Sequence, residues 1–289
     1  MLPYIDVHAH IGDTVSRVPT VGQTLGRYLA RMAGTGVVAA VLSPAGGGPQ
    51  ARGVLDTRDQ NAAIVAACRL YPDRFPVGLG VVEVRHGADG VRELVRSMDE
   101  GGLRGFMVHP GLSGHALGRE LHPFLEVVAE RSGLCLLHQR GSTGDIAAYA
   151  RRFPAITFIV GHVATSAASH RDAVEHLRGL DNVWYDIAQH PADPSADWDL
   201  AQLLRGLNPE HLLFGSDTPY YDFRRVQALI EGSGISQEDK HAIAWRNAAA
   251  LIRHFRPDWG VPETAVVPPQ RYGGSELWAT QAPGSPRLL

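Results

Sequence analysis

Two histidines stand two positions apart near the start of the sequence, in the stretch IDVHAHIG. Side chains of a β-strand alternate between its two faces, so His8 and His10 of one strand would point the same way, about 7 Å apart. Two imidazoles so placed can hold one metal ion between them. Asp6 would lie on the same face one step deeper and could orient a ligand, while Val7 and Ala9 would face outward. A His-x-His pair alone is weak evidence, because histidines are also ordinary core and surface residues.

Other polar residues end later apolar segments of the chain, and these are His109, His138, His162 and Asp217. Imidazoles and carboxylates are metal ligands and proton carriers. Their recurrence at one kind of position therefore indicates a metal or catalytic site more strongly than any one of them does. We interpret most other histidines as surface residues of helices and loops.

Eight short β-rich segments could position these residues. They lie at 4–11, 37–44, 75–82, 103–110, 134–141, 157–164, 182–189 and 212–219. Most are continuously apolar, as parallel strands buried on both faces are, and helical patterns separate them. This alternation predicts an α/β protein, a (β/α)8 TIM barrel, whose active site would lie at the carboxyl ends of the strands. An open doubly wound sheet is the alternative, but no GxGxxG follows the first segment.

The barrel is expected to form a single domain over residues 1–255. After Arg256 the composition changes, and residues 256–289 are rich in Pro and Gly without periodicity. This pattern predicts an extended or loosely ordered C-terminal tail. Its aromatic residues Trp259, Tyr272 and Trp278 could anchor parts of it to the barrel or to a neighbouring subunit.

Bulk composition narrows the class of protein. The chain has 289 residues, 44% of them hydrophobic, and a net charge of −3 with scattered basic residues. Nucleic acid is therefore an unexpected partner, and no apolar run reaches the roughly 18 residues that span a bilayer. The start of the chain lacks the pattern of a signal peptide. The two cysteines, Cys68 and Cys135, cannot form a disulfide framework. We expect a cytoplasmic protein with a small-molecule substrate, and the sequence leaves homo-oligomer formation open.

The segments IDVHAHIG, LRGFMVHPG, LLHQRG, FIVGHVA and LLFGSDTPY resemble the amidohydrolase superfamily. The resemblance is to the amidohydrolase-related (amidohydrolase 2) branch, which includes aminocarboxymuconate-semialdehyde decarboxylase, and covers about residues 4–255. It implies one divalent metal ion, usually Zn²⁺ with Mn²⁺ as the alternative. The implied ligands are His8, His10, His138 and Asp217, with His162 beside the metal. Binuclear members use a carboxylated lysine, commonly on strand 4, and neither 103–110 nor 134–141 contains lysine.

The resemblance leaves the reaction open between two routes. In hydrolysis of a small amide, lactone or ester, metal-activated water attacks a carbonyl, His162 steadies the oxyanion and Asp217 transfers the proton. The same residues could serve non-oxidative decarboxylation of a small carboxylic acid. His-x-His, where several decarboxylases have Glu-x-His, and the compact chain favour hydrolysis. A metal-free lactonase-like enzyme and a non-catalytic binding barrel are further alternatives.

Substrate contacts are expected from the loops that follow the strands. Candidates are His109, Arg140, Tyr220 and Arg224. Arg140 could bind a carboxylate or pair with Asp145. The glycine-rich stretch PAGGGPQARGVLDTRDQN follows the second segment and could act as a lid, with Arg52 and Arg58 as further anion-binding candidates.

Overall fold

The computed structural model describes residues 2–14, 21–113, 116–138, 142–163, 165–189 and 200–263. Its strands are β1 (Tyr4–Thr14), β2 (Val21–Gln23), β3 (Val37–Pro44), β4 (Val77–Gly78), β5 (Gly80–Val81), β6 (Gly105–Val108), β7 (Leu134–His138), β8 (Thr157–Gly161), β9 (Val183–Asp186) and β10 (Leu212–Leu213). Its α-helices are α1 (Leu25–Met32), α2 (Val54–Leu70), α3 (Gly87–Asp99), α4 (Pro110–Ser113), α5 (His122–Ala129), α6 (Gly144–Arg152), α7 (Ala167–Leu177), α8 (Leu200–Gly206), α9 (Phe223–Gly232), α10 (Gln237–His241) and α11 (Asn247–Phe255). Short 3₁₀ turns lie at Val84–His86, Arg119–Leu121 and Pro209–His211, and a π-helical segment at Ala242–Arg246 joins α10 to α11.

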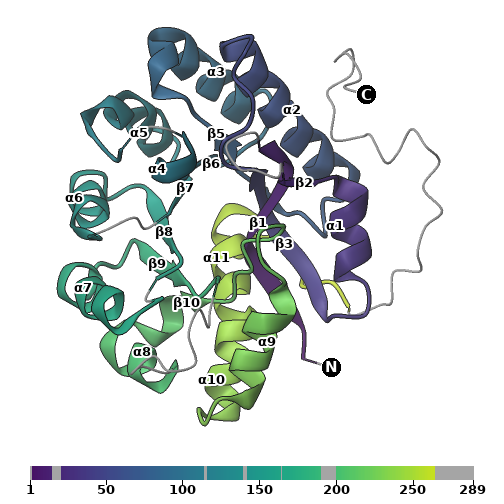
Figure 1. Ribbon diagram of the computed structural model, residues 1–289, viewed down its shortest axis with the longest axis vertical. Coiled ribbons are helices and arrows are strands. Elements are labelled where there is room, and N and C mark those ends of the chain that lie inside the picture. Colours follow the sequence, from purple (N-terminus) through teal and green to yellow (C-terminus); the bar gives the residue numbers. More distant parts are fainter. Residues whose placement is uncertain are drawn as a thin grey trace.

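The parallel strands form a ring with helices on its outside (Figure 1). One sheet has the order β2-β1-β3-β4 and the other β10-β9-β8-β7-β6-β5. The continuous segment 77–81, which carries β4 and β5, connects the two sheets on one side. On the other side, Val7 N donates to Phe214 O (3.1 Å) and Asp217 N donates to His8 O (2.8 Å). These contacts join β1 to the segment after β10, so the predicted TIM barrel is confirmed.

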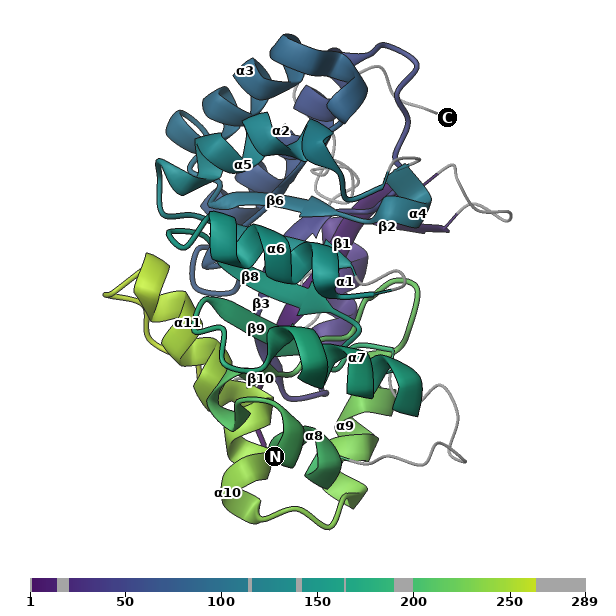
Figure 2. The same ribbon diagram turned by 90° about the vertical axis from the view of Figure 1, so that its left-hand side faces the viewer.

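An apolar cluster fills the barrel interior. It includes Ile5, Val7, Val41, Leu79, Met107, Leu136, Ile159 and Leu213. Ala248 and Ile252 of α11 belong to the same cluster, and Figure 2 shows α11 at the end of the barrel opposite to α4. A second cluster packs the outer faces of the strands, including Phe106 and Phe158, against the helices. Because α11 covers the amino ends of the strands, the polar residues are left at the carboxyl ends.

A β-bulge in β1 changes which of its side chains face inward. Asp6 pairs with Ala40, but the next pair is Ala9 with Leu42, so β1 has one residue more than β3 over this stretch. Ile5 and Val7 therefore lie in the inner cluster, and His8 and His10 face inward as well. The expectation that Val7 would face outward, and that Asp6 would share a face with His8, was wrong for this reason.

Other expectations differ in detail. β1 continues to Thr14 and pairs antiparallel with β2, which the sequence did not predict. Helix α2 begins at Val54, so the glycine-rich loop is shorter than expected. Trp259 is buried and its Nε1 donates to Asp73 O (3.0 Å), which anchors this part of the chain to the barrel. Tyr272 and Trp278 lie outside the described residues. None of the described helices is both long and apolar enough to cross a membrane.

Candidate metal centre

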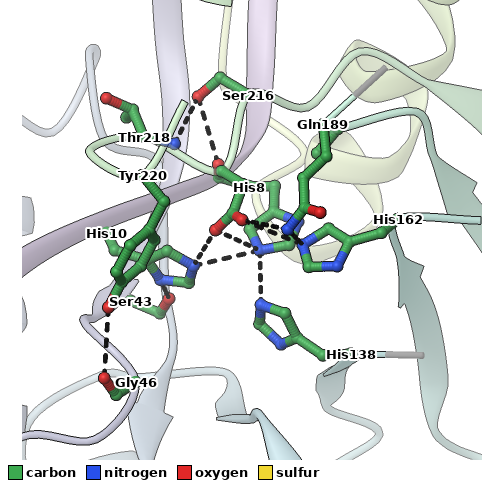
Figure 3. A network of polar contacts seen from close by, with 12 residues as sticks. His8, His10, Ser43, Gly46, His138, His162, Gln189, Ser216, Thr218 and Tyr220 are labelled. Carbon is green, nitrogen blue, oxygen red and sulfur yellow. Dashed lines mark hydrogen bonds and ion pairs between the residues drawn. The ribbon is translucent and has the colours of Figure 1, made fainter. Parts of the chain in front are cut away.

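Four side chains from separate parts of the ring converge at its carboxyl end (Figure 3). His8 and His10 come from β1, His138 ends β7, and Asp217 follows β10. His8 Nε2 lies 2.9 Å from His138 Nε2 and 3.1 Å from His10 Nε2, and His10 Nε2 lies 3.1 Å from Asp217 Oδ1. One ligand atom from each residue lies within 4.8 Å of all the others, and all four residues are buried. The structure therefore brings together the whole predicted ligand set.

The outer nitrogen of each imidazole has its own partner. His138 Nδ1 lies 3.0 Å from the carbonyl oxygen of Val108, His8 Nδ1 lies 2.8 Å from Asp186 Oδ2, and His10 Nδ1 lies 2.8 Å from Ser43 Oγ. Since a carbonyl and a carboxylate only accept, Nδ1 of His138 and of His8 carries the proton. When both rings are neutral, their Nε2 lone pairs face each other across 2.9 Å, an arrangement that a cation between them stabilises. This donor set fits a metal ion.

Charge in the site supports the same fit. Burial alone would raise the pKa of Asp217, but the neighbouring His10 and His162 outweigh it and hold that pKa well below its usual range. Burial, and next the charge of His8, holds the pKa of His138 well below its usual range. Oδ1 of Asp217 is buried and accepts no well-formed hydrogen bond from the described residues. An ionised carboxylate with one unsatisfied oxygen, beside the uncharged imidazole of His138, suits a divalent cation.

The number of ions follows from the number of ligand groups. Within the ranges that the structure describes, this is the one cluster of histidine, cysteine or carboxylate side chains able to hold a metal. It offers three nitrogens and one oxygen, which is enough for one ion.

His162 lies beside the cluster. Its Nε2 is 3.2 Å from Asp217 Oδ2, and its ring stacks on that of His8 at 4.9 Å between centroids. Its backbone N–H donates to Asp186 Oδ1 (3.1 Å), which holds the turn after β8. His162 is thus next to the second oxygen of Asp217 and is not one of the four converging residues.

Only two of the four predicted substrate-binding residues are seen to lie beside the ligand cluster. The ring of His109 is 4.5 Å from that of His138, and the ring of Tyr220 is 6.0 Å from that of His10, so both border the site. Arg224 is exposed on the first turn of α9, and Arg140 lies outside the described residues. Substrate binding by these four residues stays a prediction.

Two further arginines have structural partners. Arg52 forms ion pairs with Asp56 and Asp59, and Arg58 forms one with Glu93. These pairs fasten the start of α2, which accounts for both side chains without a bound anion.

Sequence reasoning missed three residues around the ligands: Ser43, Asp186 and Gln189. Asp186 ends its strand in WYDIAQ, so the strand-end rule that found His138 could also have found it. Asp6 contacts the ligand residue His8 through its backbone and not through its imidazole: Asp6 Oδ1 accepts from the His8 N–H (3.1 Å). Its Oδ2 accepts from Ser216 Oγ (2.7 Å) and Tyr28 Oη (3.0 Å), which ties β1 to the segment after β10 and to α1.

Comparison with known proteins identifies the family and the fold of this chain. No curated protein matches the sequence significantly. A solved structure of 5-carboxyvanillate decarboxylase from Sphingomonas paucimobilis is 17% identical with a TM-score of 0.62, covering 88% of this chain and 99% of that one. A protein assigned as 2-pyrone-4,6-dicarboxylic acid hydrolase from Pseudomonas putida is 20% identical with a TM-score of 0.62, and the match covers 88% of this chain and 98% of that one. A dihydroxybenzoic acid decarboxylase from Polaromonas sp. JS666, with bound manganese and 2-nitroresorcinol, is 16% identical with a TM-score of 0.65, and the match covers 88% of this chain and 97% of that one.

At these identities the structures establish the shared fold alone. The family is shown by the sequence itself, because residues 5–253 match the family model described as Amidohydrolase. The matched range begins just before His8 and His10 and extends past Asp217, so it contains the whole ligand cluster. The chain therefore belongs to the amidohydrolase family.

Proposed function

We propose that this protein is a mononuclear metal-dependent hydrolase of a small amide, lactone or ester. The observation that carries the proposal is that the two carboxylate oxygens of Asp217 face different groups. Its Oδ1 faces the imidazole cluster, 3.1 Å from His10 Nε2, while its Oδ2 faces His162, 3.2 Å from Nε2. One carboxylate can thus act as a ligand and handle a proton at the same time.

A divalent ion held here would supply Lewis acidity, which polarises a carbonyl and lowers the pKa of water. The chain's own groups would do the rest. Asp217 Oδ2 would accept a proton from the attacking water and return it to the leaving group. His162 would donate a hydrogen bond to the developing oxyanion of the substrate. The depressed pKa of Asp217 keeps that carboxylate ionised.

Zn²⁺ is the ion that we propose, because the ligand set of three imidazoles and one carboxylate is typical of zinc. Mn²⁺ is the alternative, since the dihydroxybenzoic acid decarboxylase of the same fold contains manganese. We further propose that His109 and Tyr220, which border the site, contact the substrate, together with Arg140 and Arg224. A reducing, cytoplasmic location is supported by the two cysteines, which are both free.

Decarboxylation of a small carboxylic acid is the second candidate. It is favoured by the shared fold with 5-carboxyvanillate decarboxylase and dihydroxybenzoic acid decarboxylase. The 2-pyrone-4,6-dicarboxylic acid hydrolase, also of this fold, favours hydrolysis. The His-x-His pair in β1 leads us to place hydrolysis first.

A substrate panel tests the two reactions side by side. Protein loaded with one equivalent of Zn²⁺ or Mn²⁺ is incubated with lactones, esters, amides and aromatic carboxylic acids. Acid release in a pH-stat reports hydrolysis of lactones and esters, amine release reports hydrolysis of amides, and ¹³CO₂ from carboxyl-labelled substrates reports decarboxylation. We expect acid release that His162→Asn and Asp217→Asn abolish. Release of ¹³CO₂ alone would replace the hydrolase assignment, and full turnover in both variants would refute the catalytic assignment.

A further inference from the structure

Gln189, three residues after the end of β9, lies at the junction of the two proposed proton-handling groups. Its Nε2 is 2.6 Å from Asp217 Oδ2 and 3.0 Å from His162 Nε2 (Figure 3). Because a carboxylate oxygen only accepts, the amide nitrogen donates to Asp217 Oδ2, and His162 Nε2, 3.2 Å from the same oxygen, donates to it as well. The reversed amide would set its carbonyl oxygen against a carboxylate oxygen, which repels. The contact therefore defines Gln189 as a donor to Asp217.

The backbone supports this arrangement at unusual conformational cost. In the described ranges, the non-glycine residues with positive φ are Ser132, His162, Gln189 and Asp217. The last three have φ of 61°, 67° and 58°, and they are the same three residues whose side chains contact one another. Such a conformation is disfavoured for a non-glycine residue unless its surroundings hold it there. Three successive strand ends thus adopt a rare conformation that aims three side chains at one point.

Asp186 connects this group to the ligands. One of its oxygens, Oδ2, lies 2.8 Å from His8 Nδ1, and the other, Oδ1, accepts from the backbone N–H of His162 (3.1 Å) and of Ala188 (2.9 Å). The turn that carries Gln189 is therefore held by the same carboxylate that orients a ligand. Asp186 thus holds the backbone one residue before Gln189.

We propose that Gln189 is a positioning residue that holds Oδ2 of Asp217 against His162, so that only Oδ1 faces the imidazoles of the ligand cluster. The inference rests on the proposed function, because it concerns the same carboxylate. Rotation of an aspartate about χ2 exchanges its two oxygens over a broad, roughly two-fold profile, so an anchor at one oxygen is needed to separate their roles. A neutral amide provides that anchor without adding charge beside the ligand set.

The test measures metal binding in the full-length protein. Metal affinity is determined by chelator competition with Zn²⁺, and coordination geometry by the visible spectrum of the Co²⁺-loaded protein. Loss of a group that supports a ligand weakens metal affinity by about 10–100-fold. We expect Gln189→Ala to retain one site with at least about tenfold weaker affinity and an altered Co²⁺ spectrum. Gln189→Glu should also alter the Co²⁺ spectrum, because its carboxylate repels Oδ2 of Asp217 instead of holding it.

Gln227→Ala is the matched control. Gln227 is also a glutamine with a placed amide, donating to Thr35 O (2.7 Å) in a part of α9 that does not contact the ligands. This variant should lose stability but keep the wild-type affinity and spectrum. If both Gln189 variants matched Gln227→Ala in affinity and spectrum, the positioning role would be refuted.

The outcomes separate this inference from the proposed function. Altered metal binding in the Gln189 variants, with no turnover by the wild-type protein on any substrate, would support the inference and refute the function. Wild-type turnover with unchanged metal binding in the Gln189 variants would support the proposed function and refute the inference about Gln189. A wild-type protein that takes up no metal would overturn both.

Discussion

At the scale of single residues, Asp186 determines which nitrogen of His8 is available for a metal. Its Oδ2 accepts from His8 Nδ1, and so Nε2 is the nitrogen that points toward the other ligands and can bind an ion. In Asp186→Asn the amide can still accept from the two backbone N–H groups, but its NH₂ would face His8. Donation to Nδ1 would move the imidazole proton to Nε2, where it obstructs the metal.

We therefore expect Asp186→Asn to weaken Zn²⁺ binding by about 10–100-fold, as measured by chelator competition. Glu93→Gln is the control, since Glu93 is a buried carboxylate paired with Arg96 and Arg58, away from the site. Equal metal affinity in both variants would show that the partner of His8 does not control the ligand.

His162→Asn separates catalysis from metal binding. His162 has φ of 61°, and asparagine tolerates this left-handed conformation better than most residues. It is not among the four converging residues, so metal stoichiometry should be unchanged, while kcat should fall by about 10²–10⁴-fold. Elemental analysis checks the metal stoichiometry, and steady-state kinetics check the fall in kcat. A variant that lost the metal would instead make His162 part of the binding site.

The ligands could be predicted from the sequence because each stands at the end of an apolar segment, and strand ends of a barrel meet at one face. The residues that support them could not be predicted in the same way. Ser43 acts on His10 across the β1–β3 pair, and Gln189 acts on Asp217 across two strand ends. Such partners depend on register and on local backbone conformation, neither of which leaves a periodic signal.

At the scale of elements, all eight predicted segments contain parallel strands of the ring. Continuous apolar runs carried that prediction, because strands buried on both faces have this composition. The bulge in β1 left no comparable signal, since one extra residue changes the register without changing the composition. It is nevertheless what lets Val7 fill the interior while His8 faces the same way.

Close approach of the segments around β1 makes Gly215 a structural requirement. A Cβ at this position would lie 2.9 Å from His8 Cβ and 3.1 Å from Asp186 Cβ. Gly215→Ala should therefore push β1 and β9 away from the segment after β10, with a loss of about 1–3 kcal/mol in the free energy of unfolding and weaker metal binding. Gly232→Ala is the control, because a Cβ there meets nothing within 4 Å. Denaturant unfolding should distinguish them, and equal stability would contradict the packing argument.

At the scale of the whole molecule, the C-terminal boundary of the barrel can be tested by truncation. Trp259 is 3% exposed and belongs to the cluster that fills the interior. A chain ending at residue 263 should keep the wild-type melting temperature. A chain ending at residue 255 should lose about 3–5 kcal/mol, comparable to deleting a buried tryptophan side chain. Size-exclusion chromatography with light scattering on the same proteins would also test homo-oligomer formation and any part that residues 264–289 have in it.

Metal should act on the stability of the entire barrel. The four ligands belong to β1, β7 and the segment after β10. An ion would therefore link parts of the ring that are far apart in the sequence, such as His8 and His138, which are separated by 130 residues. An ion that binds only the folded state stabilises it by about 2.7 kcal/mol at a concentration 100 times its Kd. Removing it with a chelator should lower the melting temperature by several degrees, and added Zn²⁺ should restore it. His8→Ala should show little response to either treatment. A wild-type protein that contains one equivalent of metal, yet melts at the same temperature without it, would mean that the imidazoles do not need a cation to hold their places.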